Sequence, residues 1–298
     1  MLESIKGTLK SKEISFLENV SFKSLTTIKC GGVAPLVVMP RTVDQFVFTL
    51  RALLKTTIPF RVVGNMSNIL PPDDEYSGVV IKTTLLYRVA IDENTVTAEC
   101  GAKISNVLWL AAKKNLGGAE GLFMIPGTLG GMVYGNAGAY GVSMSDFFIR
   151  GTFFDPYADR VISLSSAEMK FSYRHSVLSS RELYLLSASL SLQRASFESI
   201  RLKIAEFARQ RRISQPTTYP SLGSVFRRDG DIIPARIIDE LGLKGTVVGG
   251  AAVSEKHAGF IINYDNATAS DVRELVDKIK KEVADRLSYD LKREIEYL

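Results

Sequence analysis

The sequence has few of the residues that build disulfide frameworks and metal sites. Of its 298 residues only two are cysteine, Cys30 and Cys100, and only two are histidine, His175 and His257. No Cys-x-x-Cys pair occurs, which excludes a disulfide framework and predicts a reducing, cytoplasmic environment. Two histidines cannot supply a His-rich metal site, and no carboxylate motif marks another, so no metal is expected.

Long apolar runs and basic tracts are also missing. Runs such as 107–112 are far shorter than the roughly 20 residues that a membrane span needs. The first ten residues contain no apolar core of a signal peptide, so we expect neither export nor a membrane partner. The net charge of +5 suits anionic ligands, but without a Lys/Arg block nucleic acid is not the expected partner.

The composition is that of a folded globular protein. Hydrophobic residues make up 46% and charged residues 23% of the chain, which excludes a largely disordered protein. The length predicts two domains, and the pattern of polar and apolar residues changes near residue 194. We therefore expect one domain over residues 1–194 and a second over 195–298.

Periodicity predicts an α+β protein, with many strands before residue 194 and a mixed pattern after it. The first 25 residues show only weak periodicity. Helices are predicted over 42–55, from 104 to near 117, over about 197–212, from Pro234 to Gly242, and from a cap at Thr268 or Ser270 to 287. Strands are predicted over 36–39, 60–63, 79–82, 87–91, 95–99, 151–155, 160–164, 183–192 and 259–263.

Two glycine-containing loops carry the first functional signal. One is 64–70, directly after a predicted strand, and the other lies within 117–141. The second stretch holds 9 of the 23 glycines and a single charged residue, Glu120. Glycines let a backbone approach a ligand closely, and successive N–H groups form anion-binding nests. No GK[ST] or GxGxxG pattern occurs, so neither a P-loop nor a Rossmann site is indicated. Tight turns in a strand-rich domain are the alternative interpretation, which is favoured for 64–70 taken alone but not for 117–141.

The order of the short motifs resembles that of the UDP-N-acetylenolpyruvoylglucosamine reductase family, in its shorter form. The matching pieces follow the family order from about residue 26 to the C-terminus. They are 27–34, 64–70, 125–131 with 136–141, 173–176, 215–216, 223–226, 242–245, 249–253 with 256–258, and 291–294.

This resemblance implies a fold and a reaction. Residues up to about 194 would form an FAD-binding unit of the PCMH (vanillyl-alcohol-oxidase-like) type. Residues from about 195 would bind substrate, with the C-terminal segment returning to the active site. NADPH would reduce non-covalent FAD, and flavin N5 would then deliver hydride to C3 of the enolpyruvyl group, with a proton to C2. The product would be UDP-N-acetylmuramate for peptidoglycan synthesis, made by a protein expected to be a monomer.

Three catalytic residues follow from the resemblance. Arg174 matches the arginine that binds and stabilises the substrate carboxylate, for which a planar, permanently charged guanidinium is suited. Ser224 matches the serine that protonates C2, and Glu294 matches the glutamate that assists as a neutral acid. Glu296 is the alternative to Glu294, although the spacing from Leu291 favours 294.

The resemblance also implies binding residues. Those for FAD are Gly64, Asn65, Ser67, Asn68, Ile125, Pro126, Gly127, Thr128, Gly130, Gly131, Asn136, Gly138 and Ala139. Those for substrate are Tyr140, Arg212, Lys244 and His257, with a purely structural histidine as the other interpretation of His257.

The sequence departs from the family pattern at two positions. Met66 stands where the flavin loop usually has a second glycine, and Arg228 stands where many members have an asparagine. Two other functions are weighed against the reductase: another PCMH-type flavoenzyme, and a non-catalytic nucleotide-binding protein. Many such flavoenzymes attach FAD through His or Cys, and neither residue occurs in 64–70 or 117–141. Arg174, Ser224 and Glu294 together argue against a non-catalytic protein.

Overall fold

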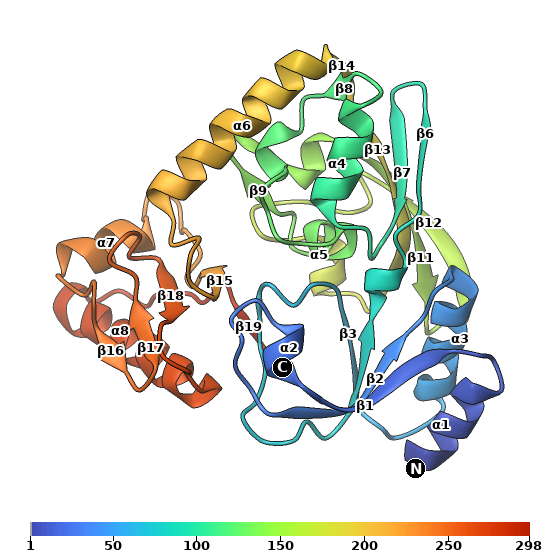
Figure 1. Cartoon of the computed structure of the whole chain (residues 1–298), viewed down its shortest axis with the longest axis horizontal. Helices are drawn as coiled ribbons and strands as arrows, with labels where there is room; N and C mark the ends of the chain where they lie inside the picture. The colour runs from blue at the N-terminus through green and yellow to red at the C-terminus, as the bar shows by residue number, and fades with distance from the viewer. Residues whose placement is uncertain (1) are drawn as a thin grey trace. The chain divides into compact units, whose positions relative to one another are not determined.

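The computed structural model describes residues 2–298 and divides into two compact units (Figure 1). The first unit comprises residues up to Leu17, Leu36–Asn65 and Gly78–Arg209. The second comprises Glu18–Pro35, Met66–Ser77 and Gln210–Leu298. Each unit therefore contains segments from distant parts of the sequence, and residues 195–209 belong to the first by this division.

One sheet at the N-terminal end is built largely of parallel strands, in the order β1-β2-β5-β3. The strands β2 (Val33–Met39) and β3 (Phe60–Val63) both pair in parallel with β5 (Val79–Lys82). The remaining strand is β1 (Ser15–Ser21), and the helices are α1 (Leu2–Lys10) and α3 (Val43–Leu54). Thr42 caps α3 by accepting a hydrogen bond from the Gln45 N–H, as its sequence position predicts.

A five-stranded antiparallel sheet, in the order β12-β11-β13-β7-β6, completes the framework of the first unit (Figure 1). Its strands are β6 (Val89–Asp92), β7 (Thr95–Glu99), β11 (Phe148–Asp155), β12 (Arg160–Ser165) and β13 (Tyr184–Ser191). The helix α4 (Ile104–Ala112) follows β7 directly along the chain. The strand predictions for these segments are confirmed within a few residues.

The glycine-rich stretch folds into short pieces rather than open loop. These are β8 (Leu116–Gly117), η2 (Glu120–Leu122), α5 (Leu129–Tyr134), β9 (Gly138–Ala139), β10 (Val142–Ser143) and η3 (Met144–Asp146). The strand β8 pairs with β14 (Gln193–Arg194), and β9 pairs with β10. The two other 3-10 turns of this unit are η1 (Thr83–Leu85) and η4 (Val177–Ser179).

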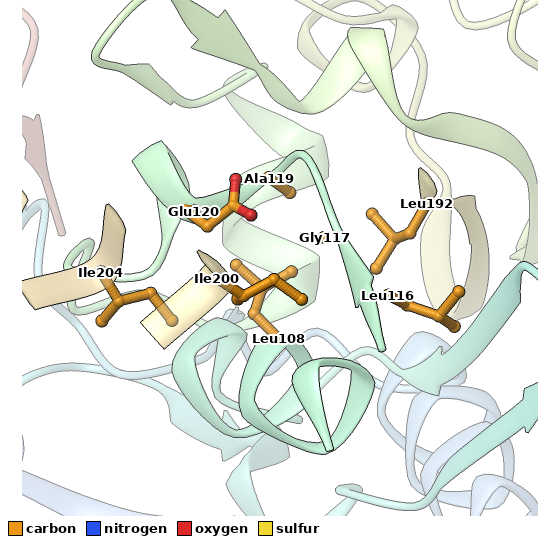
Figure 2. Close-up of a pocket in the computed structure, with 8 residues that line it drawn as sticks. All are labelled: Leu108, Leu116, Gly117, Ala119, Glu120, Leu192, Ile200 and Ile204. Carbon is orange, nitrogen blue, oxygen red and sulfur yellow. The ribbon is translucent and has the colours of Figure 1, made fainter. Parts of the chain in front are cut away.

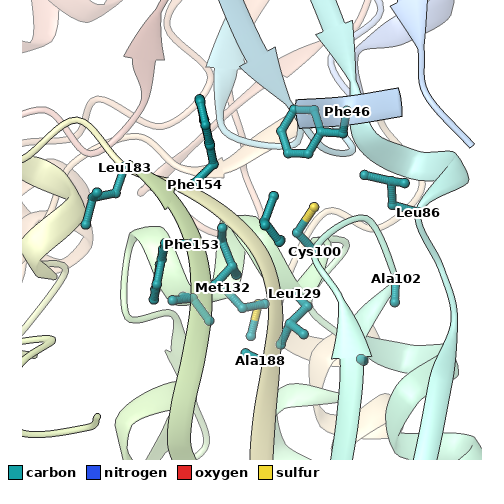
Figure 3. Packing of buried hydrophobic residues seen from close by; sticks show 14 of the residues in the cluster. Phe46, Leu86, Cys100, Ala102, Leu129, Met132, Phe153, Phe154, Leu183 and Ala188 are labelled. Atoms are coloured by element: carbon teal, nitrogen blue, oxygen red, sulfur yellow. The ribbon is translucent and has the colours of Figure 1, made fainter. Parts of the chain in front are cut away.

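The core of the first unit lies directly beneath this stretch. Figure 3 shows Leu129 and Met132 of α5 among Cys100, Phe153 and other buried side chains of the same cluster. All four residues are at most 3% exposed. Burying large apolar side chains of this kind contributes about 1.5–3 kcal/mol each. The apolar residues between the glycines therefore anchor this stretch to the core.

The second unit combines a small sheet with one long helix and several short elements. Its sheet order is β15-β18-β17-β16, from β15 (Ser221–Ser224), β16 (Val247–Val248), β17 (Ala251–Val253) and β18 (Phe260–Asn263). The helix α8 (Ala269–Leu287) buries Val272, Leu275, Val276, Ile279 and Val283, which confirms the predicted helical stripe. Its cap is Thr268, in a capping box with Asp271.

The other elements of this unit are short, apart from the helix that leads into it. They are α2 (Phe22–Leu25), β4 (Ile69–Leu70), α7 (Pro234–Glu240) and β19 (Glu296–Tyr297), while α6 (Phe197–Ser214) begins in the first unit. The strand β19 pairs in parallel with β4. Among residues 2–298 no helix is both long and apolar enough to cross a membrane. The α+β fold class is confirmed.

Candidate active site

Gly64 and Thr128, which come from the two glycine loops and both lie in the first unit, meet closely. A Cβ atom at Gly64 would collide with the Thr128 hydroxyl, so only glycine allows this approach. The Asn65 amide donates to the Pro126 carbonyl at 2.8 Å and ties the loops together. Within residues 2–298 the peptide N–H groups of Asn65 and Thr128 find no acceptor. Unsatisfied N–H groups at a junction of two glycine loops suit an anionic ligand.

Glycine is required by the protein at some positions of this junction and not at others. Gly130 faces the Cys100 carbonyl at 3.1 Å from its ideal Cβ position, and Gly138 faces the Val142 carbonyl at 2.7 Å. At Gly127 and Gly131 a Cβ would meet nothing closer than 3.4 Å and 3.9 Å. Neither of these two has a positive φ. Since packing does not demand glycine there, the residues fit a cradle that keeps space for FAD.

Asn136 is also committed to the protein. Its side chain is only 6% exposed, its Nδ2 donates to the Ser172 carbonyl at 3.0 Å, and its Oδ1 accepts from the Ser145 N–H at 2.9 Å. The carboxamide therefore joins β10–η3 to the turn at 172–175. Of the other expected flavin residues, Ile125 bonds back to the Leu122 carbonyl, Pro126 accepts the Asn65 amide, and Ala139 lies in β9.

Arg174 lies on a tight two-residue turn. Ser172 and His175 exchange two backbone hydrogen bonds of 3.1 Å, so Tyr173 and Arg174 form the tip. Arg174 has a φ of 52°, in the left-handed region, and its guanidinium lies 5.1 Å from the Tyr173 ring centroid. The two backbone hydrogen bonds therefore fix the main chain from which the Arg174 side chain extends.

Ser224 and Glu294, in the second unit, lie on neighbouring segments. The chain after β15 pairs with the C-terminal segment: the Val225 carbonyl accepts the Glu294 N–H at 2.7 Å, and Phe226 bridges Arg293. Gly223 has a φ of 80° at a register shift of β15, which glycine alone adopts without strain. The Glu294 N–H is therefore bonded to the residue that directly follows Ser224.

Asn68 connects the flavin loop to this segment. Its Nδ2 donates to the Glu294 carbonyl at 3.1 Å, and its own carbonyl accepts the Glu296 N–H at 2.9 Å. Glu296 thus belongs to β19, while Glu294 lies outside the strand. Two positions away in the loop, Met66 takes a φ of 48° and is 2% exposed. Met66, at the departure from the family pattern, therefore adopts the left-handed backbone conformation that glycine favours. Ser67 is the next residue of the loop.

His257, an expected substrate residue of the second unit, lies near two basic side chains. Burial, and then the charges of Lys244 and Arg228, lower the pKa of His257. The His257 Nδ1 accepts the Gly259 N–H at 3.1 Å, and its ring packs edge-on against Phe260. Lys244 is paired with Asp239 at 2.6 Å. Lys244, His257 and Arg228 therefore share one neighbourhood that suits an anion.

Arg212 and Tyr140 are held by different contacts. The Lys256 ammonium donates to the Arg212 carbonyl, which joins the end of α6 to the loop that contains His257. Tyr140, in the first unit, stacks on Phe207 with ring centroids 4.5 Å apart, and its hydroxyl donates to the Phe207 carbonyl at 3.2 Å. Each of the four expected substrate residues thus has a defined place within its own unit.

One small pocket in the first unit lies apart from these groups. Figure 2 shows it lined by aliphatic side chains, including Leu108 and Ile200, with Glu120 as the single carboxylate. The Glu120 Oε1 accepts the Gly118 N–H at 3.0 Å, and the residue is 6% exposed. A pocket lined mainly by aliphatic side chains does not match a dinucleotide. Glu120, the charged residue of the glycine-rich stretch, instead stabilises the turn at Gly118. Within residues 2–298 no group of three or more His, Cys, Asp or Glu could hold a metal.

Comparison with family models defines the class of protein. A model described as "FAD binding domain" matches residues 34–159, and one described as "UDP-N-acetylenolpyruvoylglucosamine reductase, C-terminal domain" matches residues 215–298. A berberine bridge enzyme variant shares the fold, with a TM-score of 0.50 at 12% identity over 65% of this chain and 44% of that one. The chain is an FAD-dependent oxidoreductase with a PCMH-type FAD domain.

Full-length relatives identify the family. A UDP-N-acetylenolpyruvoylglucosamine reductase of Caldicellulosiruptor bescii is 41% identical over 97% of this chain and 93% of the relative. The reductase of Caldanaerobacter subterraneus is 38% identical over 99% and 97%. The crystal structure of the Thermus caldophilus enzyme has a TM-score of 0.80 and 30% identity over 95% and 98%. The chain belongs to the UDP-N-acetylenolpyruvoylglucosamine reductase family.

Proposed function

We propose that this protein uses NADPH and non-covalently bound FAD to reduce the enolpyruvyl group of UDP-N-acetylenolpyruvoylglucosamine, giving UDP-N-acetylmuramate in the cytoplasm. The observation that carries the proposal is the pairing of the Ser224 and Glu294 segments through Val225, which brings the main chains of the two expected catalytic residues together. Membership of the family and the FAD domain support it. Without a proton donor near the flavin, hydride transfer to a carbon–carbon double bond would be incomplete.

The residues of the first unit have two tasks. Asn65, Thr128, Gly127 and Gly131 would hold FAD through peptide N–H groups and open backbone, and bound FAD would supply the hydride for C3. Arg174 would bind the substrate carboxylate. As negative charge grows on that carboxylate and on C2, the guanidinium stabilises it more strongly, which lowers the barrier.

The residues of the second unit complete the addition. The Ser224 hydroxyl would give its proton to C2. A serine hydroxyl is a weak acid, so it needs neighbours that stabilise the developing alkoxide. Glu294, whose own N–H donates to the Val225 carbonyl, would act as the assisting acid. Lys244, His257 and Arg212 would attract the nucleotide diphosphate, and Tyr140 of the first unit would add a polar contact.

A non-covalent flavin distinguishes this proposal from the covalent flavoenzymes. The segments 64–70 and 117–141 contain neither histidine nor cysteine. Acid precipitation of the purified protein should therefore release yellow flavin into the supernatant. Flavin that stays in the pellet would contradict this part of the proposal.

The function itself is tested anaerobically in two steps. Purified protein is mixed with NADPH, and loss of the oxidised flavin band shows the reductive half-reaction. The enolpyruvyl substrate is then added, and return of the band shows the oxidative half-reaction. A reduced flavin that the substrate cannot reoxidise, but that a sugar or lactone oxidase assay turns over, would favour another PCMH-type oxidoreductase.

A further inference from the structure

Lys82 stands at the end of a strand that borders the first glycine loop. It is the last residue of β5 and pairs in parallel register with Val63, the last residue of β3. Gly64 follows immediately. Because side chains alternate along a strand, and Val79 and Ile81 belong to the core cluster, Lys82 lies on the other face of the sheet. Ligands of open α/β sheets bind beyond the carboxyl ends of parallel strands, which is the edge where Lys82 lies.

Lys103 reaches the same neighbourhood from the second glycine loop. It precedes α4 and forms an antiparallel bridge with Thr128, the residue that faces Gly64. Thr83 follows Lys82, and Gly101 lies two residues before Lys103. A Cβ at Gly101 would collide with the Thr83 carbonyl, so the segments that carry the two lysines are packed against each other. Both lysines therefore border the junction of the glycine loops.

The two ammonium groups repel each other. Burial, and then the charge of Lys103, lower the pKa of Lys82. Within residues 2–298 no carboxylate contributes to this change in the pKa of Lys82. A half-buried ammonium group beside a second cation costs stability unless an anion joins them. The neighbouring N–H groups of Asn65 and Thr128 point to the same kind of ligand.

We propose that Lys82 and Lys103 bind the diphosphate of FAD, as side-chain partners of the backbone cradle at Gly64 and Thr128. The inference rests on the proposed function and adds two residues that the family motifs do not contain. A diphosphate carries two negative charges, which matches the two ammonium groups. The assignment predicts that flavin affinity depends on salt, since the exposed Lys103 is screened by ions.

The test measures flavin retention rather than turnover. Holoprotein carrying Lys82→Met, Lys103→Met or both is diluted, and released FAD is followed by its fluorescence between about 50 mM and about 500 mM NaCl. Methionine keeps the length of the side chain and removes the charge. Lys113→Met, at the exposed far end of α4, is the matched control. Lys103→Arg keeps the charge at an exposed position.

Each lysine removed should weaken FAD binding about 10-fold at low salt, the loss expected for a hydrogen bond to a charged group. The salt dependence of the dissociation constant should decrease in the same variants. Lys103→Arg should retain the affinity, and Lys113→Met should behave as wild type.

Three results would overturn the assignment. A double variant that holds FAD as tightly as Lys113→Met would exclude a contact with the diphosphate. Weaker binding with an unchanged salt dependence would indicate a structural role. Unchanged FAD affinity combined with a higher NADPH requirement for flavin reduction would assign the lysines to the pyridine nucleotide. Wild-type protein that contains no flavin contradicts the proposed function as well, and so is distinguishable from a failure of the lysines alone.

Discussion

The side chain of Asn68 donates a hydrogen bond of 3.1 Å to the main-chain carbonyl of Glu294, 226 residues further along the chain. A second bond runs from the Glu296 N–H to the Asn68 carbonyl. The flavin loop and the segment of the expected catalytic acid are therefore one hydrogen-bonded structure. The main chain at Glu294 is therefore held by Asn68, a residue of the expected flavin loop.

Replacing Asn68 by alanine should impair both stability and chemistry. Loss of the hydrogen bond should lower the free energy of unfolding by about 1 kcal/mol. Reoxidation of reduced flavin by the enolpyruvyl substrate should slow about 10-fold, because the segment of Glu294 becomes less fixed. Urea unfolding and stopped-flow absorbance measure the two effects. Asn106→Ala, at an exposed position of α4, should change neither; an equal loss in that variant would show that the effect is not specific.

Ser224→Ala should separate the two half-reactions. The substitution removes the proton donor but little volume, so the fold and the flavin should persist. Flavin reduction by NADPH should stay near normal, whereas reoxidation by the enolpyruvyl substrate should fall at least about 100-fold, within the range of general acid catalysis. Ser224→Cys should recover part of the rate.

Ser221→Ala, on the same strand β15, is the control for Ser224. Stopped-flow absorbance of the flavin follows both half-reactions in each variant. Reoxidation of Ser224→Ala at the wild-type rate would show that another group protonates C2.

Arg174→Lys should also act mainly on the oxidative half-reaction. Lysine keeps the charge but loses the planar fork that matches a carboxylate. Reoxidation should slow by about 10- to 1000-fold, as on loss of one preorganised donor. Arg150→Lys, exposed on β11, serves as the comparison. If both half-reactions slow equally, Arg174 supports the structure of its turn rather than the reaction.

His257 should make the protein less stable in acid. Its pKa is lowered in the folded state by burial and by Lys244 and Arg228. As the pH falls below the ordinary histidine value of about 6.5, the unfolded chain takes up a proton that the folded chain resists. Stability is therefore full above that value and decreases as the pH falls through the folded-state pKa.

Melting temperatures of wild type and His257→Gln measure this linkage across the mildly acidic range. His257→Gln should show a weaker decrease with falling pH, and His175→Gln should keep the wild-type slope. Identical slopes for all three proteins would show that His257 does not couple protonation to folding.

Most of the helices and strands could be predicted because their apolar residues repeat at one regular period. The stripe from Val272 to Val283 confirms this for α8, and the cap at Thr268 fixes its start. The elements α1 and β1 were missed, since their residues mix polar and apolar types. The helix α5 was missed because two of its six residues are glycine, and it is held by the buried Leu129, Met132 and Val133.

The site was predictable only through the resemblance. Ser224 and Glu294 are 70 positions apart, and nothing local in either segment shows that Val225 links them. The bonds of Asn136 and Asn68 to distant carbonyls have no sequence signature either. Lys82 could have been noticed as a lysine ending an apolar strand beside a glycine loop, but its proximity to Lys103 depends on the packing of Gly101 against Thr83.

The two cysteines give each unit its own unfolding probe. Cys100 lies in the core of the first unit and Cys30 in the core of the second, and burial raises the pKa of each thiol to about 12. In the folded protein neither thiol should react with an alkylating reagent. A short alkylation pulse, read peptide by peptide in a mass spectrometer, would report when each core opens. The natural sequence therefore allows the stability of the two units to be compared without an introduced label.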